Sequence, residues 1–122
     1  MLKLSVIIPL TLLSVMLVLS CSKDNAADQG GGTCKTTDLS FAADIQPIFN
    51  ANCTYCHSSS NLSGGQDLSN YAGVLHAIDN GKLLGVINHS SGYPAMPQGA
   101  AKLSDCNISK ITAWIAQGKL DN

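Results

Sequence analysis

Cys53-Thr54-Tyr55-Cys56-His57 is the strongest signal in the sequence, because two thiols at this spacing followed directly by an imidazole form a binding motif. Cysteine pairs with this spacing occur in zinc sites, in redox dithiols and in haem attachment sites. A zinc site needs a second Cys pair or paired histidines further along, and the sequence has neither. A redox dithiol needs a β-α-β pattern, whereas the flanking segments have helical periodicity.

The remaining interpretation of the motif is covalent attachment of one c-type haem. The two thiols of Cys53 and Cys56 would add to the two vinyl groups of haem, which leaves His57 next to the iron as its proximal ligand. We therefore expect haem c as the cofactor, bound through Cys53 and Cys56.

The second axial position has one clear candidate, Met96, because the two other methionines lie in the first twenty residues. Met96 stands between Pro94 and Pro97, which stiffen the backbone and oppose a helix, and a rigid loop can hold a thioether against iron. His76 and His89 are the competitors. We expect His76 on the polar face of a helix and His89 in a surface loop. The alternatives for His89 are a place at the rim of the haem or replacement of Met96 as ligand.

Helical periodicity surrounds the motif, and no β pattern is evident. Hydrophobic stripes and capping residues predict a small all-α domain over residues 37–122, with about four short helices around one haem. The first expected helix is capped by Ser40, and Pro47 kinks or interrupts it before Cys53. The second runs from a Ser69 cap to Asp79, and the third covers Lys82–Asn88. The fourth runs from a Ser104 cap to Gly118.

Residues 1–20 are expected to be an export signal, since Lys3 precedes a hydrophobic run that contains most of the fourteen apolar residues in this segment. Val18-Leu19-Ser20-Cys21 is similar to a bacterial lipobox, which predicts lipidation of Cys21 and a polar tether over residues 21–36. The alternatives are a retained membrane helix, or ordinary cleavage that leaves Cys21 as a thiol.

The order of these features resembles a class I (monohaem) cytochrome c over residues 39–120: a helix, the C-x-x-C-H motif, short helices, a methionine in a proline-bracketed loop and a terminal helix with Trp114. Phe41-x-x-x-Ile45-x-Pro47-Ile48 leading into Cys53 is similar to the planctomycete-type domain. The resemblance implies that the first and last helices cross, which brings the Phe41 region near Trp114. It also implies Cys53 and Cys56 as thioether sites, with His57 and Met96 as the iron ligands.

Three of the five cysteines lie outside the motif. Lipid on Cys21 leaves Cys34, just before the first helix, and Cys106, which opens the last one. If these helices pack together, a disulfide between Cys34 and Cys106 would fasten the end of the tether to the terminal helix. The alternative is two unpaired thiols.

Composition and charge narrow the range of possible functions. Seven lysines, eight aspartates and no arginine give a net charge of −1 without a basic run, which excludes a nucleic-acid-binding protein. With both axial positions filled, iron has no open site, so we expect a monomeric electron carrier rather than an enzyme. It would be lipid-anchored in a bacterial cell envelope, at the periplasmic side of a membrane or the cell surface, between a redox donor and a redox acceptor. The alternatives are a gas-binding or sensing module with a displaceable Met96 and, less well supported, a single-haem peroxidase.

Overall fold

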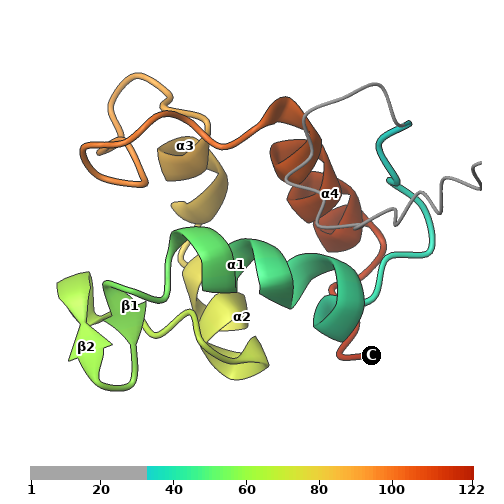
Figure 1. Cartoon of the computed structure of the whole chain (residues 1–122), viewed down its shortest axis with the longest axis horizontal. Coiled ribbons are helices and arrows are strands. Elements are labelled where there is room, and N and C mark those ends of the chain that lie inside the picture. The colour runs from blue at the N-terminus through green and yellow to red at the C-terminus, as the bar shows by residue number, and fades with distance from the viewer. Residues whose placement is uncertain (1–32) are drawn as a thin grey trace, which may run out of the picture.

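Helices form most of the secondary structure in residues 33–122, which are the residues that a computed structural model of the chain describes (Figure 1). The elements in chain order are the π-helical turn η1 (Phe41–Ile45), α1 (Gln46–Asn52), β1 (His57–Ser58), β2 (Asn61–Leu62), the 3₁₀ turn η2 (Ser63–Gly65), α2 (Tyr71–Asp79), α3 (Leu83–Ile87) and α4 (Asp105–Ala116). The predicted helical fold class is confirmed in this coarse form. The expected signal over residues 1–20, the lipid site at Cys21 and most of the tether lie outside the described residues.

The first helix begins at the predicted cap and changes its winding before the proline. The Ser40 hydroxyl accepts a hydrogen bond from the Ala43 amide at 3.3 Å, and the Asp44 carboxylate accepts one from the Ser40 amide at 2.9 Å. Lys35 forms an ion pair with the same carboxylate at 2.8 Å. Pro47 lies in the first turn of α1, where its missing N–H leaves no helical hydrogen bond unmade. The predicted interruption is therefore a change from π-helix to α-helix at residue 46.

Two further helix starts test the predicted caps. Ser104 caps α4 as expected, since its hydroxyl accepts a hydrogen bond from a backbone amide in the first turn. Ser69 as the cap of α2 is wrong, because Asn70 holds that position and its side-chain oxygen accepts from the Gly73 amide at 2.9 Å. The Ser69 hydroxyl instead donates to the Asp67 carboxylate. Both residues are good caps, so sequence could not decide between them.

One short β pairing departs from the all-α prediction. β1 and β2 are antiparallel, with His57 opposite Leu62 and Ser58 opposite Asn61. The Asn61 amide also donates to the Tyr55 carbonyl at 3.1 Å, so the hairpin is fastened to the loop that precedes it. A pairing two residues long has no alternating hydrophobic pattern, so it could not be predicted from the sequence.

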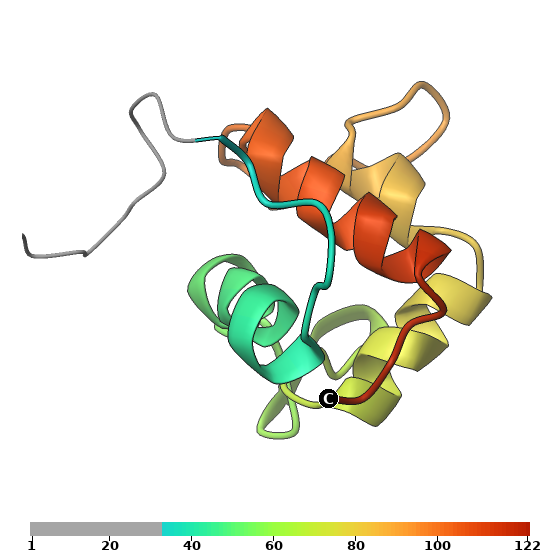
Figure 2. The same cartoon turned by 90° about the vertical axis from the view of Figure 1, so that its right-hand side faces the viewer.

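Aromatic packing joins the two ends of the fold. The rings of Phe41 in η1 and Trp114 in α4 lie 5.4 Å apart between centroids, and Tyr71 of α2 packs edge-on against Phe41 at 5.1 Å. Figure 2 shows α4 running across η1 and α1, so the crossing of first and last helices implied by the resemblance is present. The largest fully buried side chains belong to this core: Trp114, Phe49, Ile45, Ile111 and Val74.

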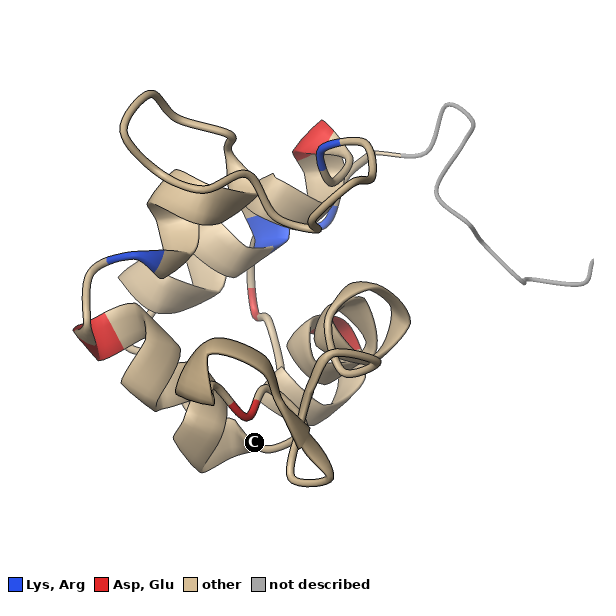
Figure 3. Cartoon of the chain, turned by 90° about the vertical axis from the view of Figure 1, so that its left-hand side faces the viewer, with Lys and Arg blue, Asp and Glu red and all other residues tan. Residues whose placement is uncertain are grey.

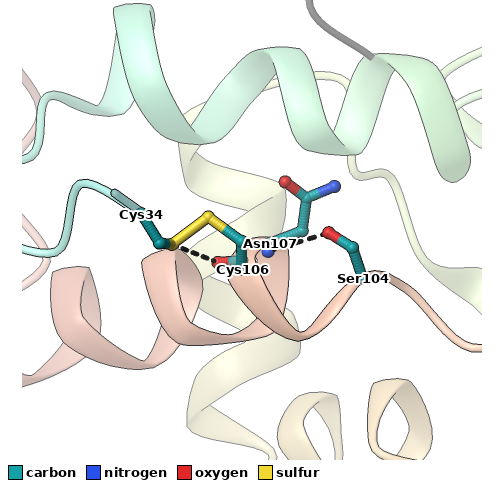
Figure 4. Close-up of a disulfide and its surroundings, with 4 residues drawn as sticks. All are labelled: Cys34, Ser104, Cys106 and Asn107. Atoms are coloured by element: carbon teal, nitrogen blue, oxygen red, sulfur yellow. Dashed lines mark hydrogen bonds between the residues drawn. A yellow bond between two sulfur atoms is a disulfide. The ribbon is translucent and has the colours of Figure 1, made fainter. Parts of the chain in front are cut away.

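A disulfide joins Cys34 to Cys106, the two cysteines that the sequence analysis pairs (Figure 4). Their Cα atoms are 5.6 Å apart, and their positions differ by 72 in the sequence. The Gln117 side chain continues this connection: it donates to the Thr36 carbonyl at 3.0 Å and accepts from the Leu39 amide at 3.1 Å. The segment before η1 is therefore fastened along α4. Within residues 33–122, no helix combines the length and apolar character that crossing a membrane requires.

Candidate functional site

The Cys-x-x-Cys-His segment is a tight turn that leaves the end of α1. The Cys53 amide donates to the Phe49 carbonyl at 2.8 Å, which continues the helix for one more residue. The amides of Cys56 and His57 then both donate to the Cys53 carbonyl, at 3.1 and 2.9 Å, and wrap the chain around that atom. The His57 carbonyl accepts from the Leu68 amide at 2.8 Å. These bonds hold the three motif residues on one continuous, ordered turn.

A cavity of about 600 Å³ lies beside this turn. Its walls include Cys53, Cys56 and His57 on one side of the fold and Met96 from the loop after α3. The rest of the lining is mainly apolar and continuous with the core, through Leu68, Ala77, Leu83, Val86, Ile87 and Leu103. A volume of this size is typical of cofactor sites and far larger than packing voids. The four predicted site residues are thus brought together around one cavity.

The two motif thiols are free, and their surroundings differ. Cys53 is partly buried and packs against the core, whereas Cys56 is exposed. Burial raises the pKa of the Cys53 thiol to about 11, because the thiolate would lose its hydration in an apolar environment. Cys53 is therefore held as a neutral thiol at physiological pH.

Polar groups at the cavity wall are incompletely satisfied by the protein. Among the described residues, His57 Nδ1 and Gln66 Oε1 are buried side-chain atoms without a hydrogen-bond partner, and both residues line the cavity. A buried polar atom without a partner costs free energy. Lys82 is the one charged residue of the lining, and it belongs to none of the three ion pairs found among residues 33–122. This wall suits a ligand that carries polar and anionic groups on an apolar body.

The two competing histidines do not line the cavity. His76 is exposed on α2, as predicted from its place on the polar face. His89 is only partly exposed, because its ring nitrogen Nε2 lies 3.0 Å from the carbonyl oxygen of Met96. His89 lies in the loop after α3, as expected, and the contact with Met96 is an addition to that expectation. The sequence did not reveal this contact, since it depends on the path of the loop between the two residues.

Lys82 and Gln66 are cavity residues that no sequence pattern indicated. Neither has a signal of its own: Lys82 precedes the short helix α3, and Gln66 follows a glycine-containing turn. No group of three or more His, Cys, Asp or Glu in the described part of the chain is arranged to hold a metal ion by itself.

A helical domain with this turn, and with two free thiols beside a shared apolar cavity, is typical of the class of c-type cytochromes. A family model described as cytochrome c oxidase, cbb3-type, subunit III matches residues 40–115, well over half of the chain. The chain belongs to this family, whose cytochrome c domains bind haem c and transfer electrons through it. Comparisons with curated proteins and with solved structures gave no match.

Proposed function

We propose that this chain is a monohaem c-type cytochrome, tethered to a membrane by lipid, that passes electrons between extracytoplasmic redox partners. One observation carries the proposal: residues of the Cys-x-x-Cys-His turn and Met96, far apart in the sequence, line the same apolar cavity. The unsatisfied His57 Nδ1 and Gln66 Oε1 at its wall support a bound polar group there. Within the family, the resemblance to the planctomycete-type domain stays a prediction.

Each cavity residue has a role in this proposal. The thiols of Cys53 and Cys56 would hold the group covalently through thioether bonds to its vinyl groups. His57 and Met96 would hold its iron. Lys82 provides a positive charge for the carboxylates of the group. When bound, haem supplies a one-electron Fe(III)/Fe(II) couple.

The apolar lining and the two axial ligands determine which chemistry is left. Buried side chains such as Leu68 and Ile87 exclude water from the cavity. With His57 and Met96 both bound to iron, the group would have no site open to a substrate. Outer-sphere electron transfer to a partner protein follows, and an enzymatic role does not.

The surface around the cavity suggests how partners associate. Residues 45–66 and 83–101, which supply most of its walls, contain no Lys, Arg, Asp or Glu. In Figure 3 the β1–β2 hairpin carries no blue or red, and the loop after α3 is blue only near the start of α4, where Lys102 lies in the sequence. Tyr55 is 91% exposed on this side, and Tyr93 is 43% exposed. Because Lys82 is the only charged residue in the cavity lining, long-range steering is weak, and association with partners is expected to depend little on salt.

Ionic strength tests this part of the proposal. Reduction of the ferric protein by a partner is measured by stopped flow at low and at physiological salt. We expect the rate to change by less than about twofold, because a surface with so few charges gives salt little to screen. A fall of tenfold or more would contradict a neutral docking surface.

Attachment of the group is tested by mass spectrometry and optical spectra of the purified holoprotein. The denatured chain should retain the mass of one haem, the pyridine haemochrome should be of the c type, and the ferric protein should show the weak far-red band of methionine on iron. Cys53→Ala and Cys56→Ala should each remove one covalent link, whereas Met96→Ala should keep the haem and lose the far-red band. A protein without c-type haem would overturn the proposal, and rapid CO binding to the reduced protein would favour the gas-binding alternative.

A matched control separates the cavity cysteines from the structural pair. The Cys34→Ser/Cys106→Ser double variant also removes two cysteine sulfurs, those of the disulfide, but it changes residues that do not line the cavity. It should keep covalent haem and the far-red band. Loss of haem in this control would mean that attachment depends on overall stability and not on the cavity residues.

The tether is tested separately, since residues 1–32 lie outside the described part of the chain. Cys21→Ser should move the protein from the membrane fraction to the soluble fraction, because a lipid chain is the proposed anchor. The haem spectrum should stay unchanged. Membrane association that survives the substitution would contradict lipidation of Cys21.

A further inference from the structure

The loop that carries Met96 is folded back onto α3 at both of its ends. The Ser90 amide donates to the Gly85 carbonyl at 3.0 Å, and the Met96 amide donates to the Val86 carbonyl at 3.0 Å. Two adjacent carbonyls of α3 therefore hold two loop residues that are six positions apart. These bonds fix the loop backbone, but neither of them involves a loop side chain.

His89 adds a side-chain connection across the same loop. Its Nε2 lies 3.0 Å from the Met96 carbonyl oxygen, and because a carbonyl only accepts, Nε2 must carry the proton. His89 has a backbone φ of 53°, in the left-handed region that few non-glycine residues occupy. The residue is thus held in an uncommon backbone conformation while its ring binds the residue whose side chain reaches the cavity.

Tyr93 closes the loop from the other side. A Cβ atom at Gly85 would lie 2.6 Å from Tyr93 Cδ1, so the tyrosine ring rests directly on the helix backbone at a place where only glycine fits. The loop is therefore held against α3 by a ring contact at its middle and by hydrogen bonds at its ends.

We propose that His89 is a positioning residue for Met96: its ring holds the Met96 carbonyl and so keeps the thioether at the cavity. The inference rests on the proposed function, in which Met96 is the distal iron ligand. A methionine side chain has three rotatable bonds and reaches one point reliably only if its backbone is fixed. His89 is unsuited to replace Met96, because it does not line the cavity and its Nε2 is already engaged.

The test compares His89→Ala with His89→Gln in the holoprotein. Both substitutions meet the same strain at φ 53°, so the difference between them reports the side-chain donor. His89→Ala should weaken the far-red band and speed CO binding to the reduced protein about fivefold to tenfold, as expected for one lost neutral hydrogen bond. His89→Gln, whose amide also donates, should restore most of both signals.

His76→Ala is the matched control, because His76 is an exposed histidine on α2 away from the loop. It should leave the band and the CO rate unchanged. The haem content of each variant, from the pyridine haemochrome, checks that the protein has assembled. If His89→Ala yields no holoprotein, His89→Asn takes its place, since asparagine tolerates the left-handed backbone and its amide is one methylene shorter than that of glutamine.

Three results separate the possibilities. A band and a CO rate in His89→Ala within twofold of wild type would overturn the positioning role. Equal losses in His89→Ala and His89→Gln would also overturn it, because backbone strain and not the donor would then be responsible. A wild-type protein that binds c-type haem but lacks the far-red band would instead overturn Met96 as ligand, which is a failure of the proposed function.

Discussion

Removal of the Cys34–Cys106 disulfide should greatly destabilise the domain. The two cysteines are 72 positions apart, so the bridge closes a loop that contains most of the folded chain. In the chain-entropy model the loss of entropy is 2.1 + 1.5R ln n cal/mol/K, which for n of 72 gives about 4.4 kcal/mol at 25 °C. Since small domains are stable by only about 5–15 kcal/mol, this is a large share of the total.

The assay is urea unfolding of the Cys34→Ser/Cys106→Ser holoprotein, followed by far-UV circular dichroism. The free energy of unfolding should fall by about 4 kcal/mol, and the melting temperature by roughly 20–35 °C for a domain of this size. The matched control is wild type treated with a thiol reductant, which opens the disulfide without changing any side chain beyond the two sulfurs.

Reduced wild type and the double variant should unfold at the same urea concentration. A loss below about 1 kcal/mol with an unchanged denaturant slope would refute the loop-closure reasoning. A variant that is much less stable than the reduced wild type would show that the serines disturb packing near α4, and that the entropy of the loop is not the main effect.

Two further substitutions test local features of the helices. Hydrogen bonding with Lys35 lowers the pKa of Asp44 below its ordinary value of 3.8, so Asp44→Asn should cost about 1 kcal/mol at neutral pH. Because the folded-state pKa of Asp44 is lowered, this contribution to stability is present above pH 3.8 and is lost as the pH falls through the folded-state value. The difference in urea midpoint between wild type and Asp44→Asn should therefore shrink in acid. A difference that does not change with pH would contradict the charge argument. Gly73→Ala would place a Cβ atom 1.7 Å from the Asp67 carbonyl oxygen. Although alanine favours helices, the variant should destabilise α2 by about 2 kcal/mol or more in thermal unfolding. A stabilised variant would show that the backbone there moves easily.

The parts of the fold that the sequence predicted are those set by residues close together in the chain. The helix from the Ser104 cap and the end of α2 near Asn80 follow from capping and periodicity within a few residues. The Cys53–His57 motif predicted the chemistry of the site for the same reason, since its meaning lies in spacing over five positions.

The features that could not be predicted depend on how segments that are distant in the sequence, or that have no sequence pattern, are placed in space. The contact between His89 and Met96 requires a backbone at positive φ, which histidine adopts only occasionally. The place of Lys82 in the cavity wall depends on how α2, α3 and the motif turn assemble, and a single lysine gives no hint of that. The β1–β2 pairing is too short to leave a pattern.

The position of the disulfide also determines at which end of the domain the preceding chain joins it. Figure 1 shows the segment that contains Cys34 at one end of the long axis, while the β1–β2 hairpin and the methionine loop, which flank the cavity, lie at the other. Because the bridge to α4 fixes the point where the preceding chain joins the domain, a pull on that chain acts at the end remote from the cavity. Under the proposed lipid tether, the face of the domain that contains the cavity would point away from the membrane, toward approaching partners.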